Sequence, residues 1–270
     1  VFSRMRRFTP VALPFLAAFA TVVLGYAGLL SALDIGSFDA RLRLRRDGGW
    51  PADLVMIPID DAVMQKHGRW PWPRRKQAEL LNEIRALGVK TLVFDFVPAA
   101  PTEEVDDRAL AAALTGALVP VGFTTQTDNS GLRDVLQNLA MVPVESPEAA
   151  SYPLEQLLVP RFLFATAAGG LGHNIFEAGD DKVLRHHAPL LRVDELAGSL
   201  PSIGLVALLR QRGVNPREVR LEGQWLRLPN GKSFGLTQGE LLLDFVPDGP
   251  APPFVRALDI LDPGVDREGL

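Results

Sequence analysis

Carboxylate side chains follow two apolar runs of the sequence and could together hold a small ligand. Asp60 and Asp61 come directly after the run Leu54–Ile59. Asp95 stands near the end of a second run, Val89–Phe96. If these runs are neighbouring parallel strands, their carboxyl ends place the aspartates at one edge of a sheet, where open α/β sheets bind ligands. Such an edge suits a polar or cationic ligand or a divalent metal; alternatively, the aspartates only cap loop N–H groups or pair with an arginine.

An aromatic loop stiffened by prolines, Trp70-Pro-Trp-Pro73, comes next and leads into Arg74. Its rings could form a stacking wall or a cage for a ligand, or they could plug the edge of the sheet. Arg74 would lie in the first turn of a helix, where a cation needs an anionic partner. We expect that partner to be Asp60 or Asp95, or else a ligand anion. The candidate ligand-binding residues are Asp60, Asp61, Trp70, Trp72, Arg74 and Asp95.

Several other chemistries lack the residues that they require. The 270 residues include no cysteine, which excludes disulfides and thiolate metal sites. The four histidines do not have the spacing of a zinc enzyme, and no nucleophile elbow, phosphate-binding loop or dinucleotide fingerprint occurs. We therefore expect no catalytic residue, no metal and no cofactor. A net charge of −4 gives no basic face for nucleic acid.

Alternating strands and helices are predicted to position the candidate residues. Helices that begin near Pro73 and near Asp106 separate three expected strands, Leu54–Ile59, Val89–Phe96 and Leu118–Phe123. This β-α-β-α-β order predicts an α/β fold with a parallel sheet layered with helices.

Antiparallel strands in the same or a joined sheet are expected in the second half, with a helix at Pro201–Arg212 and a hairpin turn at Asn230-Gly231. A Gly-rich turn at Gly169–Gly172 is expected between the first two of these strands. The expected strands are Phe162–Ala168, Val183–Val193, Arg217–Leu221, Trp225–Leu228 and Glu240–Val246.

The N-terminal region is predicted to anchor the chain in a membrane. Residues 11–33 contain no Asp, Glu, Lys, Arg or His, and a helix of that length spans the hydrocarbon core. A cleaved signal peptide and a buried core helix are the alternatives, although the apolar part of a signal peptide is usually shorter and a core helix normally has a polar face, which this segment lacks. Arginines flank the segment on both sides, so their count leaves the orientation open. We expect a cytoplasmic N-terminus at 1–10, a transmembrane helix at 11–33 and an extracytoplasmic domain at 34–270.

A series of motifs runs in a characteristic order along the chain. They are Phe38–Arg43, Ile59–Asp61, Gly68–Arg74, Phe94–Phe96, Asp106–Leu110, Gly172–Asn174, Val183–Arg185, Pro201-Ser202 and Phe254–Leu261. The series resembles the type-2 CHASE domain, an extracytoplasmic sensory module of bacterial adenylate cyclases, diguanylate cyclases, histidine kinases and serine/threonine kinases. The Gly-Arg-Trp-Pro-Trp-Pro-Arg motif is the most specific part of the resemblance.

The resemblance implies a sensory input domain rather than an enzyme. Such a domain lies outside the inner membrane and passes a ligand or environmental cue to a cytoplasmic cyclase or kinase domain. The family continues into further membrane helices and an output domain, so we expect the chain to be truncated before them or its output to be supplied elsewhere. The expected partners are a small molecule or physical cue, the membrane and a second copy in a homodimer, but no nucleic acid. The alternatives are a metal-dependent periplasmic hydrolase that uses Asp60, Asp61 and Asp95, and a ligand-free dimerisation scaffold.

Overall fold

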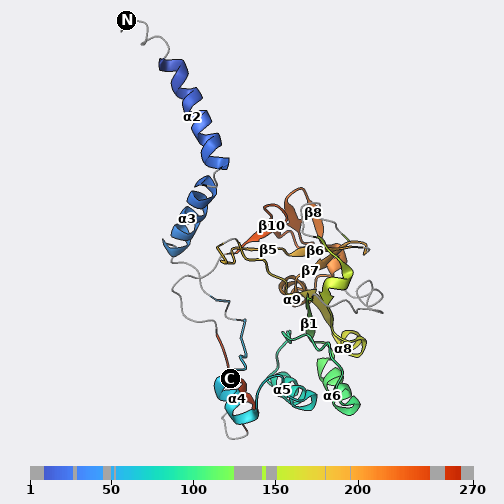
Figure 1. Cartoon of the computed structure of the whole chain (residues 1–270). Coiled ribbons are helices and arrows are strands. Elements are labelled where there is room, and N and C mark those ends of the chain that lie inside the picture. Colours follow the sequence, from blue (N-terminus) through green and yellow to red (C-terminus); the bar gives the residue numbers. More distant parts are fainter. Residues whose placement is uncertain are drawn as a thin grey trace, which may run out of the picture. The chain divides into compact units, whose positions relative to one another are not determined.

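Helices and short strands follow one another along the chain (Figure 1), which confirms a mixed α/β fold. The structure is a computed structural model, and it describes residues 9–26, 29–44, 50–51, 53–124, 142–143, 151–179, 181–194, 196–243 and 253–262. The chain divides into two compact units. The first comprises residues 1–54 and 244–253, and the second comprises residues 55–243 and 254–270.

Two helices, α2 (Thr9–Tyr26) and α3 (Leu29–Leu44), form most of the described part of the first unit. The run Val11–Leu33, for which a transmembrane helix is predicted, begins in α2 and ends in α3. Among the described residues, no helix combines the length and the apolar character needed to cross a membrane. Residues 1–8 and 27–28 lie outside the described part of the chain. The membrane anchor and the cytoplasmic segment 1–10 stay predictions.

A three-stranded sheet lies in the core of the second unit, with β1 (Leu118–Phe123) in the middle. β1 runs parallel to β4 (Gly170–His173) and antiparallel to β3 (Leu157–Leu158). A parallel bridge joins Val93 to the start of β1 at Leu118. All residues of β1 except Phe123 are buried, as expected for a strand covered on both faces. The predicted strand Leu118–Phe123 is therefore confirmed.

The remaining described strands form two further three-stranded sheets and one pair of strands. One sheet has the order β2-β6-β7, another has the order β10-β9-β8, and β11 pairs with β5. Their bounds are β2 Ser151–Tyr152, β5 His186–His187, β6 Leu190–Val193, β7 Ser199–Pro201, β8 Arg220–Glu222, β9 Trp225–Arg227, β10 Ser233–Gly235 and β11 Leu241–Leu242. The predicted hairpin is confirmed, because β9 and β10 pair antiparallel across Asn230-Gly231. Gly231 has a φ of 79°, which glycine adopts at little cost.

Helices of the second unit pack around these sheets. The α-helices are α4 Asp61–His67, α5 Arg74–Ala86, α6 Glu104–Leu114, α8 Phe162–Ala167, α9 Ile203–Gln211 and α10 Ala257–Leu261, and the 3₁₀ helices are η1 Leu154–Gln156 and η2 Pro216–Glu218. The helices predicted near Pro73, near Asp106 and at Pro201–Arg212 correspond to α5, α6 and α9. In Figure 1, α5, α6 and α8 gather at the end of this unit opposite to β5, β8 and β10.

The largest hydrophobic core joins α5, α6 and α8 to the central sheet. Leu81 of α5, Leu110 of α6 and Phe164 of α8 pack in one cluster with Val119 of β1 and Leu171 of β4. In α5, apolar residues recur three and four positions apart, which gives the helix one apolar face. A second core lies between α9 and the β8-β9-β10 sheet, and a third joins α4, α5 and α10.

Two of the predicted strands are reduced to single bridges. Met56 bridges to Phe254, and Pro58 cannot donate a ladder hydrogen bond, so Leu54–Ile59 does not extend into a strand. Val89–Phe96 pairs with β1 only at the bridge between Val93 and Leu118, where Leu118 exchanges backbone hydrogen bonds with Leu92 and Phe94, because β3 takes the same edge of β1 further along. The predicted parallel sheet of Leu54–Ile59, Val89–Phe96 and β1 is therefore wrong for Leu54–Ile59. The prediction also missed β4, which is the parallel neighbour of β1.

The region Phe162–Gly172 also differs from its predicted form. Phe162–Ala168 was expected as a strand, but residues 162–167 form α8, in which Phe164 is fully buried and Phe162 is 65% exposed. A short apolar run suits either a strand or a helix, and its alanines favour the helix. Gly169–Gly172, expected as a turn, contributes three residues to β4.

Glycine at position 172 allows the backbone of α9 to lie directly against β4. A Cβ atom at Gly172 would lie 2.7 Å from the Ile203 Cα atom, closer than atoms can pack. We expect Gly172→Ala to reduce the free energy of unfolding by about 1–3 kcal/mol, because backbone must shift to admit the methyl group. Urea unfolding of the full chain in detergent would measure this.

The matched control is Gly204→Ala, one residue into α9, where a Cβ atom would meet nothing within 4 Å. Its stability should equal or slightly exceed that of the wild type, because alanine favours a helix over glycine. Equal effects of the two substitutions would contradict the close packing of α9 on β4.

Candidate functional site

The first two candidate aspartates lie at the start of α4. The Asp60 Oδ1 atom accepts a hydrogen bond from the Val63 backbone N–H at 2.9 Å, so Asp60 caps the helix. Asp61 is the first residue of α4 and is exposed. An aspartate cap satisfies an N–H group that the first turn leaves without a partner. This is the structural alternative that the sequence allowed for Asp60, and a ligand role for either residue stays a prediction.

Asp95 lies beside the end of β4. Its Oδ1 atom accepts a hydrogen bond from the Asn174 side-chain amide at 3.1 Å. The apolar runs before Asp60 and around Asp95 bridge to different segments, so strand pairing does not bring the aspartates together. Within the described ranges, no group of three or more His, Asp or Glu side chains is placed to hold a metal ion.

The aromatic loop packs into the second unit. Trp72 is buried, and its indole N–H donates a hydrogen bond to the Gly68 carbonyl oxygen at 2.7 Å. The Lys76 ammonium group lies 5.1 Å from the centre of the Trp72 ring. The half-buried Trp70 ring makes edge contacts with Trp72 and with Phe96, at centroid distances of 5.5 and 5.3 Å. The rings therefore contact one another and the core more than they line an open crevice.

Arg74 is buried, but its anionic partner is neither of the two that the sequence suggested. Its Nε atom lies 3.8 Å from the Asp107 Oδ1 atom, and both side chains are less than one-tenth exposed. The expected pairing of Arg74 with Asp60 or Asp95 is therefore wrong. Asp107 lies in the first turn of the neighbouring helix α6, which packs along α5 and brings the carboxylate to the start of α5.

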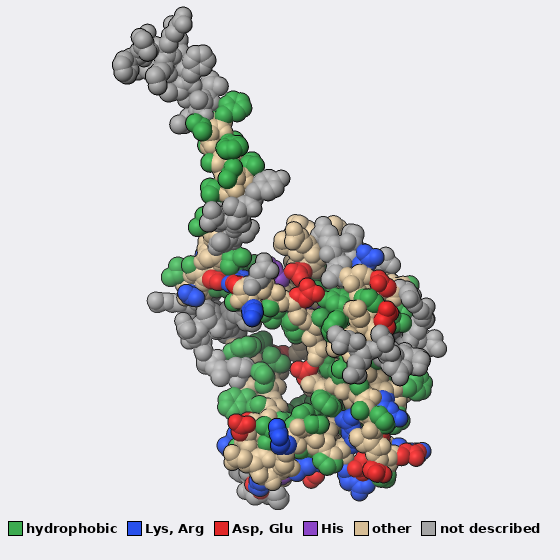
Figure 2. All heavy atoms as spheres, viewed as in Figure 1, with side chains coloured by type: hydrophobic (Ala, Val, Ile, Leu, Met, Phe, Trp, Pro, Cys, Tyr) green, Lys and Arg blue, Asp and Glu red, His purple; other side chains and the backbone are tan. Residues whose placement is uncertain are grey.

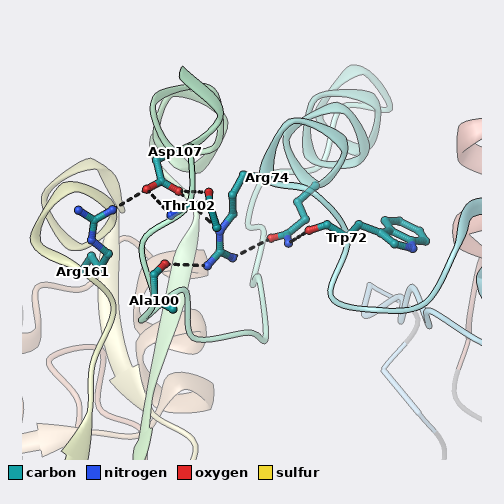
Figure 3. A network of polar contacts seen from close by, with 7 residues as sticks. Trp72, Arg74, Ala100, Thr102, Asp107 and Arg161 are labelled. Atoms are coloured by element: carbon teal, nitrogen blue, oxygen red, sulfur yellow. Dashed lines mark hydrogen bonds and ion pairs between the residues drawn. The ribbon is translucent and has the colours of Figure 1, made fainter. Parts of the chain in front are cut away.

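Hydrogen bonds connect the Arg74 guanidinium to the aromatic loop (Figure 3). One terminal nitrogen donates to the Ala100 carbonyl oxygen and the other to the Gln77 side-chain oxygen, each at 3.3 Å. The Gln77 amide nitrogen then donates to the Trp72 carbonyl oxygen at 2.6 Å. Arg74 and Gln77 thus connect the aromatic loop, which belongs to the motif that carries the family resemblance, to helix α6.

Asp107 is the centre of this polar network, because three donors bind its carboxylate and the Arg74 guanidinium forms an ion pair with it (Figure 3). The Thr102 hydroxyl donates to Oδ1 at 2.6 Å, and the Thr102 backbone N–H donates to Oδ2 at 3.2 Å. The Arg161 guanidinium also binds Oδ2, opposite to Arg74. A buried charge is tolerated only when it is paired and hydrogen-bonded, and Asp107 meets both conditions.

Burial and charge act in opposite directions on the pKa values of this network. Burial by itself raises the pKa of Asp107, but the Thr102 hydrogen bonds and the charges of Arg161 and Arg74 outweigh it and bring the pKa below its ordinary value. Burial lowers the pKa of Arg74, the charge of Asp107 opposes that effect, and the charge of Arg161 adds to it. The carboxylate therefore remains ionised at neutral pH.

Sequence reasoning treated Asp107 only as part of a helix-opening motif and did not consider Arg161. A usable signal was the position of Asp107 on α6. Leu110, Ala111 and Leu114 follow it at intervals of three, four and seven residues, so Asp107 lies on the buried face of the helix. A carboxylate on an apolar face predicts a cationic partner, although it does not say which one.

A pocket of about 490 Å³ opens beside this network, within the usual size range of small-molecule sites. It is lined by Pro101, Thr102, Glu104, Asp107, Arg108, Arg161 and Leu163. None of the six candidate residues from the sequence lines it. The candidate site of the structure is therefore the Asp107 network together with this pocket.

Substitution of Asp107 should be far more harmful than substitution of the aspartate next to it. We expect Asp107→Asn to lower the free energy of unfolding by about 3–5 kcal/mol, because it leaves the buried Arg74 charge uncompensated. Asp106 pairs with Arg75, whose side chain is mostly exposed, so Asp106→Asn should cost about 1 kcal/mol or less. Urea unfolding of both variants would measure the difference, and similar losses would refute the central role of Asp107.

Comparison with known proteins identifies the family of the chain. Residues 16–269 match the family model described as the CHASE2 domain. The comparisons with curated proteins and with solved structures gave no match. The family match covers nearly the whole chain, including the aromatic loop, helices α4 and α5 on either side of it, and the Asp107 network. The chain therefore belongs to the CHASE2 domain family, a family of extracellular sensory domains.

Proposed function

We propose that the chain is the extracytoplasmic sensory input domain of a membrane-bound signal-transduction protein, and that it passes a ligand or environmental cue to a cytoplasmic cyclase or kinase domain. The observation that carries this proposal is the CHASE2 family match over residues 16–269. The pocket beside Asp107, which charged and apolar side chains line together, supports it, because it offers a place where a cue could bind. A cue acts only by binding one of two conformational states more tightly, and 1.4 kcal/mol of difference shifts their ratio tenfold.

The proposal includes an anchor in the inner membrane at residues 11–33 and a homodimer as the signalling unit. Helix α2 supports the anchor, because it carries large apolar side chains that are exposed around the helix, as the visible face in Figure 2 illustrates. They are Phe15, Leu16, Phe19, Val22, Val23 and Leu24, and Phe15 is 73% exposed. A soluble protein rarely leaves such a surface in water, whereas lipid covers it without cost.

The location of the domain can be tested with reporters fused after Leu270. Alkaline phosphatase, which is active only outside the cytoplasm, should be active in this fusion, and green fluorescent protein exported through the same route should stay dark. Deletion of residues 11–33 should abolish the phosphatase activity and serves as the control. Bright fluorescence with an inactive phosphatase would place residues 34–270 in the cytoplasm and would overturn the proposal.

The sensory role can be tested by thermal unfolding of the full chain in detergent with a library of small metabolites. We expect at least one compound to raise the melting temperature, because a ligand at one hundred times its Kd stabilises the state that binds it by about 2.7 kcal/mol. A stable dimer that no compound stabilises would instead favour a ligand-free scaffold.

A further inference from the structure

The Asp107 network carries one more positive charge than negative charge. Arg74 and Arg161 both pair with the single carboxylate of Asp107. The Arg74 and Asp107 side chains are 7% and 3% exposed, whereas the Arg161 side chain is 39% exposed. The excess charge is therefore accessible from solvent only at Arg161, at the edge of the pocket.

The walls of the pocket combine charged and apolar groups. Arg108 and Glu104 form an exposed ion pair one helical turn apart, and such pairs stabilise a helix by only about 0.3–0.5 kcal/mol. The Arg108 guanidinium can therefore turn toward a ligand at little cost. Pro101 and Leu163 add apolar surface. Figure 2 shows Lys or Arg and Asp or Glu side chains mixed over the region of α6 and α8.

Building on the sensory function proposed above, we propose that this pocket binds a small organic carboxylate and that this ligand is the cue. A guanidinium fork binds a carboxylate through two parallel hydrogen bonds, and the single excess charge of the network matches a monoanion. The apolar walls favour an acid with a compact apolar body over an inorganic anion. A cationic ligand is disfavoured, because Thr102, Arg74 and Arg161 already surround the Asp107 oxygens.

A bound carboxylate competes with Asp107 for Arg161 and thereby changes the attachment of α8 to α6. Arg161 immediately precedes α8, and its backbone N–H donates to the Pro98 carbonyl oxygen at 3.1 Å. Its side chain joins α8 to Asp107 of α6. When a ligand takes part of this guanidinium, Asp107 depends more on Arg74, which connects through Gln77 to the aromatic loop. Occupation of the pocket therefore acts on the segment that carries the most specific family motif.

Isothermal titration calorimetry tests this binding: benzoate or isobutyrate is titrated into the full chain in detergent. Benzamide and isobutyramide are the matched neutral probes. We expect millimolar or tighter binding of at least one acid and at least about tenfold weaker binding of its amide, which is the effect of losing a charge-assisted hydrogen-bond pair. Arg161→Gln should weaken binding of the acid by a similar factor.

Arg75→Gln is the control variant, because Arg75 also pairs with an aspartate of α6 but does not line the pocket. It should bind the acid as the wild type does. If Arg161→Gln fails to fold, Arg161→Lys keeps the charge beside Asp107 but loses the planar fork, and it should also weaken binding several-fold.

The proposal is overturned if neither acid binds at millimolar concentration, if the amides bind as tightly as the acids, or if binding survives every substitution of Arg161. These outcomes are separate from the tests of the sensory role. A metabolite that stabilises the chain regardless of Arg161 would retain the sensory function and place its ligand elsewhere, whereas a cytoplasmic location would remove the extracytoplasmic role without affecting acid binding.

Discussion

A buried carboxylate that two guanidinium groups share is the constraint on which this part of the structure depends. Asp107 of α6 pairs with Arg74 at the start of α5 and with Arg161 just before α8, so one carboxylate connects three helices. Removing ionised groups from water costs several kcal/mol per ion, and only close partners offset this cost. Thr102 supplies two further hydrogen bonds, and the Arg74 guanidinium also lies over the Phe96 and Phe164 rings. The helices must therefore keep their arrangement for the charges to remain paired.

The aromatic loop connects two hydrophobic cores of the second unit. Trp72 belongs to the core that joins α4, α5 and α10, where it packs with Val63 and Ile260. Trp70 contacts Phe96, which packs against the core of the central sheet. Hydrogen bonds from Arg74 through Gln77 hold the loop between them. A movement of α6 or α8 that altered the Asp107 network would consequently reach both cores, which is a property suited to a domain that must convert local binding into a wider rearrangement.

The candidate site lies at the Asp107 network and not at the aspartates that the sequence suggested. Asp60 and Asp95 have local roles, as a helix cap and as the acceptor of an asparagine side chain. Of the residues singled out from the sequence, Arg74 and Trp72 take part in the polar network, Arg74 with a charged partner from another helix and Trp72 only through its carbonyl oxygen. The pocket beside Asp107 and Arg161 arises where the loop before α6 meets the start of α8, and neither segment is next to the other in the sequence.

The sequence by itself determined the family, the strand Leu118–Phe123, helices α5, α6 and α9, and the hairpin at Asn230-Gly231. These features depend on local signals, namely apolar periodicity, glycine at turns and a motif of adjacent residues. Only the tertiary structure decided that Arg74 pairs with Asp107, that Phe162–Ala167 is helical and that β4 lies beside β1. Those outcomes depend on which distant surfaces bury one another, because burial sets both the conformation of a short apolar run and the partner that a buried charge must find.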